Sequence, residues 1–256
     1  MEERSFVKKF KKDIIGFAPS YSETPRTILN KVKNFLPLKN TIHEVHWLKQ
    51  IFNATTYFEK EANESKFKEA ENYKVQHLAM HGFLNTNNDL FSGLVFSNAK
   101  TGEEDDVLYA YEIYDLKKDC ELVCLSACNT GVGKLEKGEG VMSLGRAFRH
   151  AGSNSVCMSL WVSDDIQNRT LMQEFYSGLK GELTKDKALQ MAKLSLLDNN
   201  KKQFPHYWAS FILMGSNDPI TFRKGFANYI WGGVLLITLL AGLMFLFRDK
   251  LFNREN

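Results

Sequence analysis

The sequence has few cysteines, no strong excess of charge of one sign and no low-complexity tract, and each shortage excludes a class of protein. Four cysteines in 256 residues are too few for a scaffold built on disulfides. A formal net charge of +3 gives no basis for a nucleic-acid-binding surface. The composition is 44% hydrophobic and 25% charged, which excludes a disordered or collagen-like chain. The length allows one large domain or two small ones.

The amino-terminal residues also lack an apolar stretch, because MEERSFVKKFKKD alternates charged and aromatic residues. We therefore expect no secretory signal peptide there. The carboxyl-terminal part is the opposite, since residues 225–247 contain no charged side chain. Within them Tyr229–Phe247, YIWGGVLLITLLAGLMFLF, would span roughly 28 Å as a helix, about the hydrocarbon thickness of a bilayer. The sequence thus predicts a single transmembrane helix over 229–247, followed by a short basic tail over 248–256.

The residues that flank this segment support a membrane location. Tyr229 and Trp231 stand at one end, where amphipathic rings prefer the interface, and Arg248 and Lys250 stand at the other. Cations flank both ends, so the side of the membrane on which the remaining residues lie stays open. The prediction is a single-pass protein anchored in a lipid bilayer.

Residues 1–222 alternate short apolar runs with amphipathic stretches, the pattern of an α/β domain with a mostly parallel sheet. The expected strands are Asp13–Phe17, Thr55–Phe58, Val75–His81, Leu94–Phe96, Glu121–Ala127, Ser155–Trp161 and Trp208–Met214. The expected helices are Thr41–Phe52, Ser65–Tyr73, Val141–His150, Asp164–Leu179 and Lys185–Leu197.

No motif predicts a metal or an organic cofactor. Cys120, Cys124 and Cys128 recur every four residues, but on a strand that spacing is about 13 Å, too far for thiolates that share one metal. The same distance separates His77 from His81. The stretch HEVH at 43–46 lacks the spacing that places two imidazoles on one helix face.

One pair of residues has the chemistry of a cysteine nucleophile and its base. Cys128 ends an apolar strand just before a glycine-rich loop, and in open α/β sheets the working crevice lies outside the carboxyl ends of strands. His81 ends another expected strand and is followed by Gly82. Thiol catalysis needs an imidazole partner and N–H donors for the oxyanion, which the Gly82 and Cys128 amides would supply. From these residues alone, an inert buried cysteine remains the alternative.

Several blocks of the sequence resemble the CHAT family of caspase-like peptidases, in the caspase, separase and gingipain group. The blocks follow one another in family order from about residue 75 to 215: VQHLAMHGF, SGLVFSN, ELVCLSACNTG, GEGVMSLGRAFRHAGSNSVCMSLW, VSDDIQNRTLMQEFY, KALQMAKLSLL and HYWASFILMG. By position, His81 matches the family's catalytic histidine and Cys128 its nucleophile, while His77 matches a histidine that we take as structural. The separation of 47 residues fits the spacing of about 50 in caspases.

The resemblance implies a three-layer α/β/α sandwich and a cysteine endopeptidase that cleaves a protein substrate in bacterial signalling or defence. Together with the apolar segment 229–247, this predicts a membrane-anchored endopeptidase. Members of the family usually follow helical repeats and begin with further strands, so a tetratricopeptide-repeat or other regulatory protein is an expected partner. The alternative is a catalytically silent module that acts through interactions at the membrane.

Three further residues near these blocks could bind substrate. Asp164 and Asp165 would suit a basic side chain, but they also stand where a helix N-cap belongs, which we favour. Ser126 lies two residues before Cys128 on the same strand face, and a structural use is as well supported as contact with substrate.

Overall fold

The apolar runs of the sequence form a six-stranded sheet in the order β10-β9-β7-β3-β1-β2. Its strands are β1 (Lys12–Ala18), β2 (Thr55–Phe58), β3 (Tyr73–Leu78), β7 (Leu122–Leu125), β9 (Ser155–Ser159) and β10 (Phe211–Gly215). All neighbours are parallel except β9 and β10. The central strands are buried along almost their whole length because both faces of the sheet are covered.

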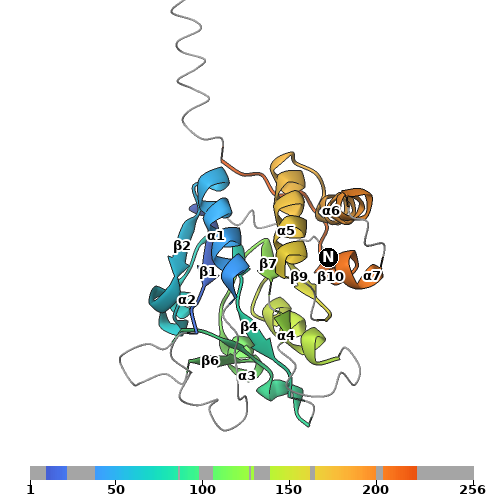
Figure 1. Ribbon diagram of the computed structural model, residues 1–256. Helices are drawn as coiled ribbons and strands as arrows, with labels where there is room; N and C mark the ends of the chain where they lie inside the picture. The colour runs from blue at the N-terminus through green and yellow to red at the C-terminus, as the bar shows by residue number, and fades with distance from the viewer. Residues whose placement is uncertain are drawn as a thin grey trace, which may run out of the picture. The chain divides into compact units, whose positions relative to one another are not determined.

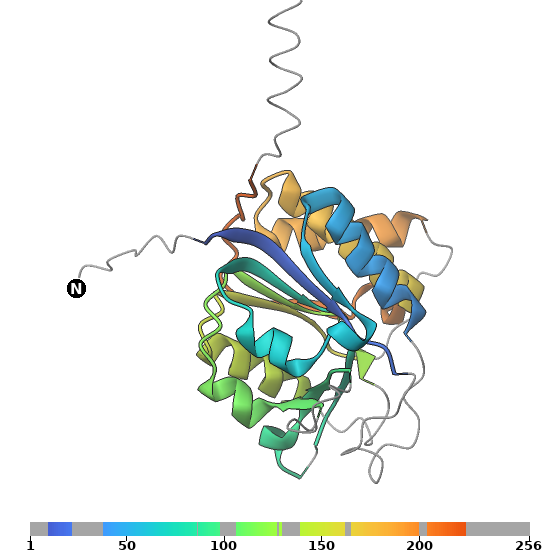
Figure 2. The same cartoon turned by 90° about the vertical axis from the view of Figure 1, so that its left-hand side faces the viewer.

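The computed structural model describes residues 10–21, 38–85, 87–97, 106–126, 128–129, 139–161, 165–199 and 204–223. Helices α1 (Lys39–Phe52), α5 (Asp165–Lys180) and α6 (Lys185–Asn199) cover one face of the sheet, and α7 (Pro205–Trp208) packs on α5 and α6. Helices α2 (Glu64–Glu69), α3 (Ala110–Asp115) and α4 (Glu139–His150) lie on the other side (Figures 1 and 2). This arrangement confirms the predicted three-layer sandwich with a mostly parallel sheet.

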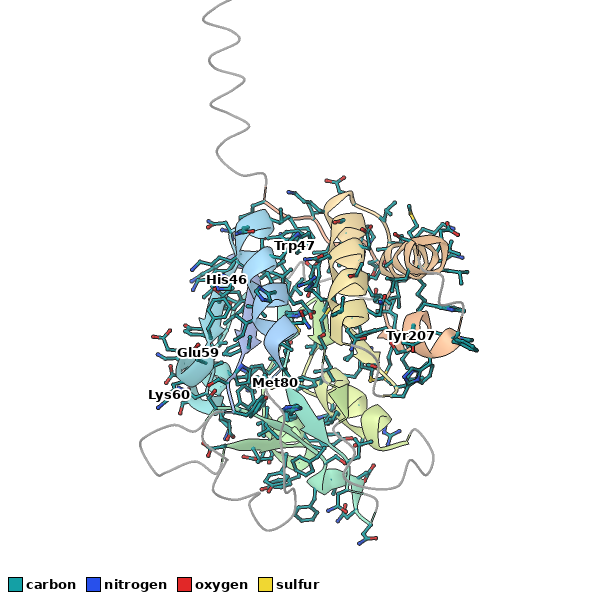
Figure 3. The ribbon with its side chains drawn as sticks, viewed as in Figure 1. His46, Trp47, Glu59, Lys60, Met80 and Tyr207 are labelled. Carbon is teal, nitrogen blue, oxygen red and sulfur yellow. The ribbon has the colours of Figure 1, made fainter. Side chains whose placement is uncertain are left out.

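A second, smaller sheet was not predicted. It has the order β6-β5-β4-β8 and consists of β4 (His81–Phe83), β5 (Gly93–Val95), β6 (Val107–Tyr109) and β8 (Cys128–Asn129). Its β4 follows β3 after the two residues Ala79 and Met80, and the fully buried Met80 marks the bend (Figure 3). The single strands predicted at Val75–His81 and Glu121–Ala127 are wrong in this respect, because each ends early and the chain then changes sheets.

Two other boundaries differ from the prediction by more than two residues. The helix predicted over Ser65–Tyr73 ends at Glu69, where the buried ammonium of Lys118 donates hydrogen bonds to the carbonyls of Phe67, Lys68 and Ala70. These bonds satisfy the last carbonyls of α2, and Tyr73 then begins β3. Near the end of the domain, Trp208 closes the short helix α7 that begins at Pro205, so β10 begins later than predicted.

Within the described residues, no helix is long and apolar enough to cross a membrane. The segment 229–247 lies outside those residues, so the transmembrane helix stays a prediction. The contacts of the chain define a compact unit over residues 1–221, and the domain bounds of 1–222 stay a prediction.

Candidate active site

The second sheet brings His81 and Cys128 together. Strands β4 and β8 are parallel, with His81 opposite Cys128 and Gly82 opposite Asn129. Neighbouring strands lie about 4.8 Å apart, and residues in register share a face of the sheet. The two residues that the sequence pairs at a distance of 47 positions are therefore adjacent in space.

A second histidine–cysteine pair lies four residues upstream in the main sheet. His77 of β3 is opposite Cys124 of β7, and this pair has the same separation of 47 residues. The connections from β3 to β4 and from β7 to β8 are thus equal in length. Since β3 and β7 are paired with His77 opposite Cys124, two connections of equal length place His81 opposite Cys128 in the second sheet.

Tyr21, which the sequence did not single out, holds His81 in place. Its hydroxyl accepts a hydrogen bond from the backbone N–H of His81 and donates one to the carbonyl of Val95, both at 2.9 Å. The Tyr21 ring also lies against the imidazole, with a centroid distance of 4.5 Å. Burial raises the pKa of Tyr21 well above its usual range, so its hydroxyl stays protonated and available as a donor. His81 itself is fully buried.

His77 has a different environment, in which every contact is structural. Its Nε2 forms an ion pair with Glu44 of α1 at 3.0 Å, and its Nδ1 lies 3.0 Å from the hydroxyl of Tyr176 on α5. Burial alone lowers the pKa of His77, but the charge of Glu44 and hydrogen bonds with Cys124 and Glu44 raise it from 6.5 to about 9. His77 is therefore a charged group that joins the main sheet to two helices.

Three of the four cysteines are buried free thiols: Cys120, Cys124 and Cys157. Burial and a hydrogen bond with Cys157 raise the pKa of Cys124 well above its usual value, although His77 acts in the opposite direction. A neutral, buried thiol is a poor nucleophile. Cys128 differs in its position, at the edge of the second sheet.

Ser126 and Glu44 link α1 to the strand that leads to Cys128. The hydroxyl of Ser126 donates a hydrogen bond to Glu44 at 3.2 Å, and both residues are buried. This contact is structural, while the predicted contact of Ser126 with substrate stays a prediction. The sequence did carry a signal for Glu44, because it lies on the buried helix face between Thr41 and Leu48. An acidic residue on such a face needs a buried partner.

The remaining predicted site residues are placed only in part. Gly82 is buried in β4 beside His81. Asp165 is the first residue of α5, which fits a helix start at this point, and Asp164 lies outside the described residues. Among the residues that the structure describes, no group of three or more His, Cys, Asp or Glu could hold a metal ion.

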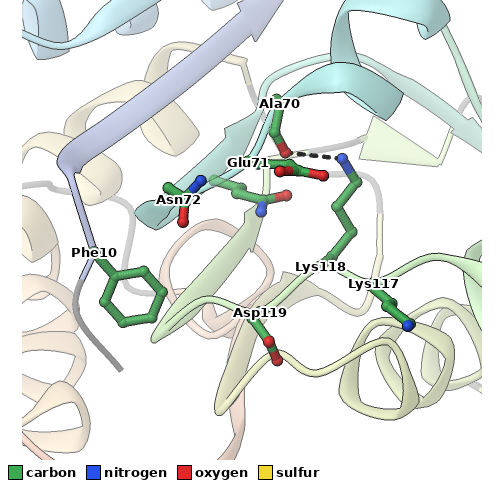
Figure 4. Close-up of a pocket in the computed structure, with 8 residues that line it drawn as sticks. Phe10, Ala70, Glu71, Asn72, Lys117, Lys118 and Asp119 are labelled. Atoms are coloured by element: carbon green, nitrogen blue, oxygen red, sulfur yellow. Dashed lines mark hydrogen bonds between the residues drawn. The ribbon is translucent and has the colours of Figure 1, made fainter. Parts of the chain in front are cut away.

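A cavity of about 350 Å³ lies away from these residues, beside the start of β3. Its lining includes Phe10, Gln76, Lys118 and Asp119 (Figure 4). Lys118 has a structural role there, because its ammonium binds Ala70 and the end of α2. Burial lowers the pKa of Lys118 to about 8. The cavity contains neither residue of the His81–Cys128 pair.

Comparisons with known proteins agree with the sequence blocks. The sequence profile of the CHAT domain matches residues 8–216. Tetratricopeptide repeat protein 28 of Homo sapiens is 32% identical over 111 residues, which are 43% of this chain and 4% of that protein. The Mus musculus protein of the same name is 30% identical over the same shares. The chain thus spans a small part of these relatives.

Among solved structures, the Arg-specific cysteine proteinase gingipain R has a TM-score of 0.49 and 10% identity, covering 84% of this chain and 48% of that one. The separase–securin complex of Saccharomyces cerevisiae has a TM-score of 0.44 and 16% identity, covering 80% of this chain and 12% of that one.

Proposed function

The chain belongs to the CHAT domain family, and we propose that it is a cysteine endopeptidase with Cys128 as nucleophile and His81 as general base. The observation that supports this most directly is the parallel register of β4 with β8, in which His81 lies opposite Cys128. A thiol and an imidazole on adjacent strands, beside the backbone N–H of a glycine, are the groups that acyl transfer needs.

The proposed reaction uses these residues alone. The Cys128 thiolate attacks the carbonyl carbon of a peptide bond, forming a C–S bond, while the Gly82 and Cys128 amides donate to the oxyanion. The imidazolium of His81 then gives its proton to the leaving nitrogen as the C–N bond breaks. Water attacks the thioester and His81 accepts a proton from that water, so the C–S bond breaks to give the carboxylic acid product and the Cys128 thiolate beside the imidazolium of His81.

The upstream pair supplies a matched control for the nucleophile. We expect Cys128→Ala to abolish cleavage of a proteome-derived peptide mixture by the full chain, while Cys124→Ala leaves cleavage in place. Iodoacetamide near pH 7 should label Cys128 at least roughly tenfold faster than Cys120, Cys124 or Cys157, because those three are buried. Mass spectrometry of the alkylated chain measures both rates. Equal labelling of the four thiols would contradict the assignment.

The two histidines provide a second control. His81→Ala should abolish cleavage and slow alkylation of Cys128 at neutral pH, since the partner that favours the thiolate is lost. His77→Ala should keep thiol reactivity in the folded fraction but lower the free energy of unfolding by about 3–5 kcal/mol, because Glu44 is left as an unpaired buried charge. The reverse pattern, with reactivity lost only in His77→Ala, would contradict the dyad.

One observation favours the second candidate, a catalytically silent module that acts by interaction. His81 has no exposed surface, so a substrate can reach it only after neighbouring side chains move. A silent module would leave Cys128 unlabelled by a thiol-reactive peptide electrophile even at high concentration. Labelling of the full chain, lost in Cys128→Ala, would exclude this candidate.

Two partners complete the proposal. The bilayer would be contacted through residues 229–247, which are uncharged and long enough to cross it. A tetratricopeptide-repeat protein is the proposed regulator, supported by the relatives that match this chain, which bear such repeats in their names. Proximity labelling from the full chain in its native membrane tests the proposed regulator. A tetratricopeptide-repeat protein among the labelled proteins would support the proposal, and a set of labelled proteins without one would contradict it.

A further inference from the structure

Four aromatic residues gather on the second sheet, next to the candidate dyad. This aromatic cluster consists of Phe83 on β4, Phe91 before β5, Tyr109 on β6 and Tyr111 on α3. Each ring lies near at least one other, with centroid distances of 5.4–6.2 Å. Phe91 is 47% exposed and Tyr111 is 42% exposed. Single exposed aromatic side chains are common, but a connected group of them typically marks an interaction site.

The register of the second sheet relates the cluster to His81. Phe83 follows His81 by two residues, so both lie on one face of β4. Phe83 pairs with Gly93 and Gly93 with Tyr109, two positions along the sheet from the pairing of His81 with Val95. Strand spacings place Phe83 about 7 Å and Tyr109 roughly 12 Å from His81. An extended peptide covers that distance in two to four residues.

The packing around Gly93 shows that the cluster is built into the sheet. A Cβ at this position would lie 2.8 Å from Cγ1 of Val107 and 3.2 Å from Cε1 of Phe83. The glycine therefore leaves the space in which the Phe83 and Tyr109 rings meet edge to face, at 6.0 Å and 86°. Glu112, which accepts a hydrogen bond from the backbone N–H of Tyr109, forms an ion pair with Lys68 at 3.2 Å. Asp89 forms an ion pair with Arg146 at 3.3 Å. These charges have partners within the protein, so the rings are the groups with which the cluster selects a side chain.

The chemistry of the proposed peptidase indicates which part of a substrate reaches the cluster. Cys128 lies on one side of β4, and β5 and β6 lie on the other. The nucleophile bonds to the acyl half of the substrate, and His81 protonates the leaving nitrogen. The leaving half, which is carboxyl-terminal to the cleaved bond, should thus extend from His81 toward β5 and β6.

We propose that the aromatic cluster binds a large apolar or aromatic side chain two to four residues carboxyl-terminal to the cleaved bond of an extended peptide. This inference rests on the proposed peptidase function. It predicts that the chain selects substrates by residues after the cleaved bond. Ring-to-ring contacts give such a site its preference for aromatic residues.

The test uses the full chain and a proteome-derived peptide mixture whose cleavage sites are read by mass spectrometry. Aromatic and large aliphatic residues should be enriched roughly 3- to 10-fold at one or more of these positions. The double variant Phe91→Ser with Tyr111→Ser should lose that enrichment. The matched control is Phe204→Ser, which removes a 73% exposed aromatic residue at the start of α7 and should leave the enrichment unchanged. No enrichment in the parent chain, or enrichment that survives in the double variant, would overturn the proposal.

A second measurement separates this proposal from the peptidase itself. The full chain with Cys128→Ala is immobilised and incubated with the same mixture, and the retained peptides are identified. Retention of aromatic peptides that is lost when Phe91→Ser and Tyr111→Ser are added supports the cluster, even if the parent chain cleaves nothing and the peptidase proposal fails. Retention that does not depend on Phe91 and Tyr111, or no retention of aromatic peptides, overturns the cluster proposal.

Discussion

Two tyrosine–histidine contacts in the core have different expected roles. Tyr21 binds the backbone of His81 and covers its imidazole, while Tyr176 contacts the ring of His77. Both tyrosines are buried, and each lies against a fully buried histidine. The first tyrosine contacts the histidine of the candidate dyad, and the second contacts the histidine that forms the ion pair with Glu44. The loss of the Tyr176 hydroxyl is therefore a control for the loss of the Tyr21 hydroxyl.

Tyr21→Phe should lower the rate of cleavage while Tyr176→Phe should not. Without the Tyr21 hydroxyl, the buried N–H of His81 and carbonyl of Val95 lose their shared partner, so the backbone of His81 is held less firmly. Each variant should lower the free energy of unfolding by about 1–3 kcal/mol. Only Tyr21→Phe should reduce kcat by roughly tenfold or more and shift the pH profile of Cys128 alkylation. Identical profiles for the two variants would mean that Tyr21 is merely structural.

Helix α1 and strand β3 are joined by the ion pair of Glu44 with His77, which makes stability depend on pH. The pKa of His77 is about 9 in the folded protein and near 6.5 in the unfolded chain. The stabilisation is fully present below pH 6.5 and is lost as the pH rises through 9. We expect the free energy of unfolding, measured by urea denaturation, to fall by about 3 kcal/mol over this window from this pair.

Glu44→Gln isolates that contribution from other titrating groups. Lys118 has a lowered pKa of about 8, so it contributes with the opposite sign as the pH rises from 8 to 10.5. The variant keeps Lys118 and removes the charge that raises the pKa of His77. The difference in stability between the parent chain and Glu44→Gln should shrink between pH 6.5 and 9. A difference that is constant across this range would contradict the ion pair.

The main elements could be predicted from the sequence where the pattern is long. Helices α1 and α6 each extend two residues beyond their predicted bounds, because their patterns cover several turns. The short strand β2 has its predicted bounds. The second sheet could not be predicted in this way. Its strands have two or three residues, too few to show an alternation, and the residues at the bend, Leu78 to Met80, are all apolar.

The adjacency of His81 and Cys128 could be predicted from the sequence, but the residues that support this pair could not. His81 and Cys128 follow from spacing and family resemblance, and the register brings them together. Tyr21 could not be found, since a single tyrosine after a strand has no local signal for a partner 60 residues away. The role of Glu44 could have been predicted, because a carboxylate on a buried helix face requires a buried partner.

The whole chain combines a compact domain over residues 1–221 with the apolar segment near its end. Deletion of residues 225–256 should move the protein from the membrane fraction to the soluble fraction and leave its thermal midpoint unchanged, because the core lies before residue 222. Deletion of the tail 248–256 alone should keep the protein in the membrane fraction. Fractionation of all three forms measures this. A membrane-bound truncated domain would contradict the anchor.

The equal lengths of the β3–β4 and β7–β8 connections set which insertions the protein can tolerate. The connections between the elements from Phe83 to Leu122 do not determine which residue lies opposite Cys128, so we expect changes in their length to be tolerated. One extra residue after Ala79 would move β4 out of step and turn His81 to the opposite face, since strand faces alternate with a period of two. We expect that insertion to abolish Cys128 reactivity. A second extra residue after Ser126 would bring the two strands back into step and should restore part of it.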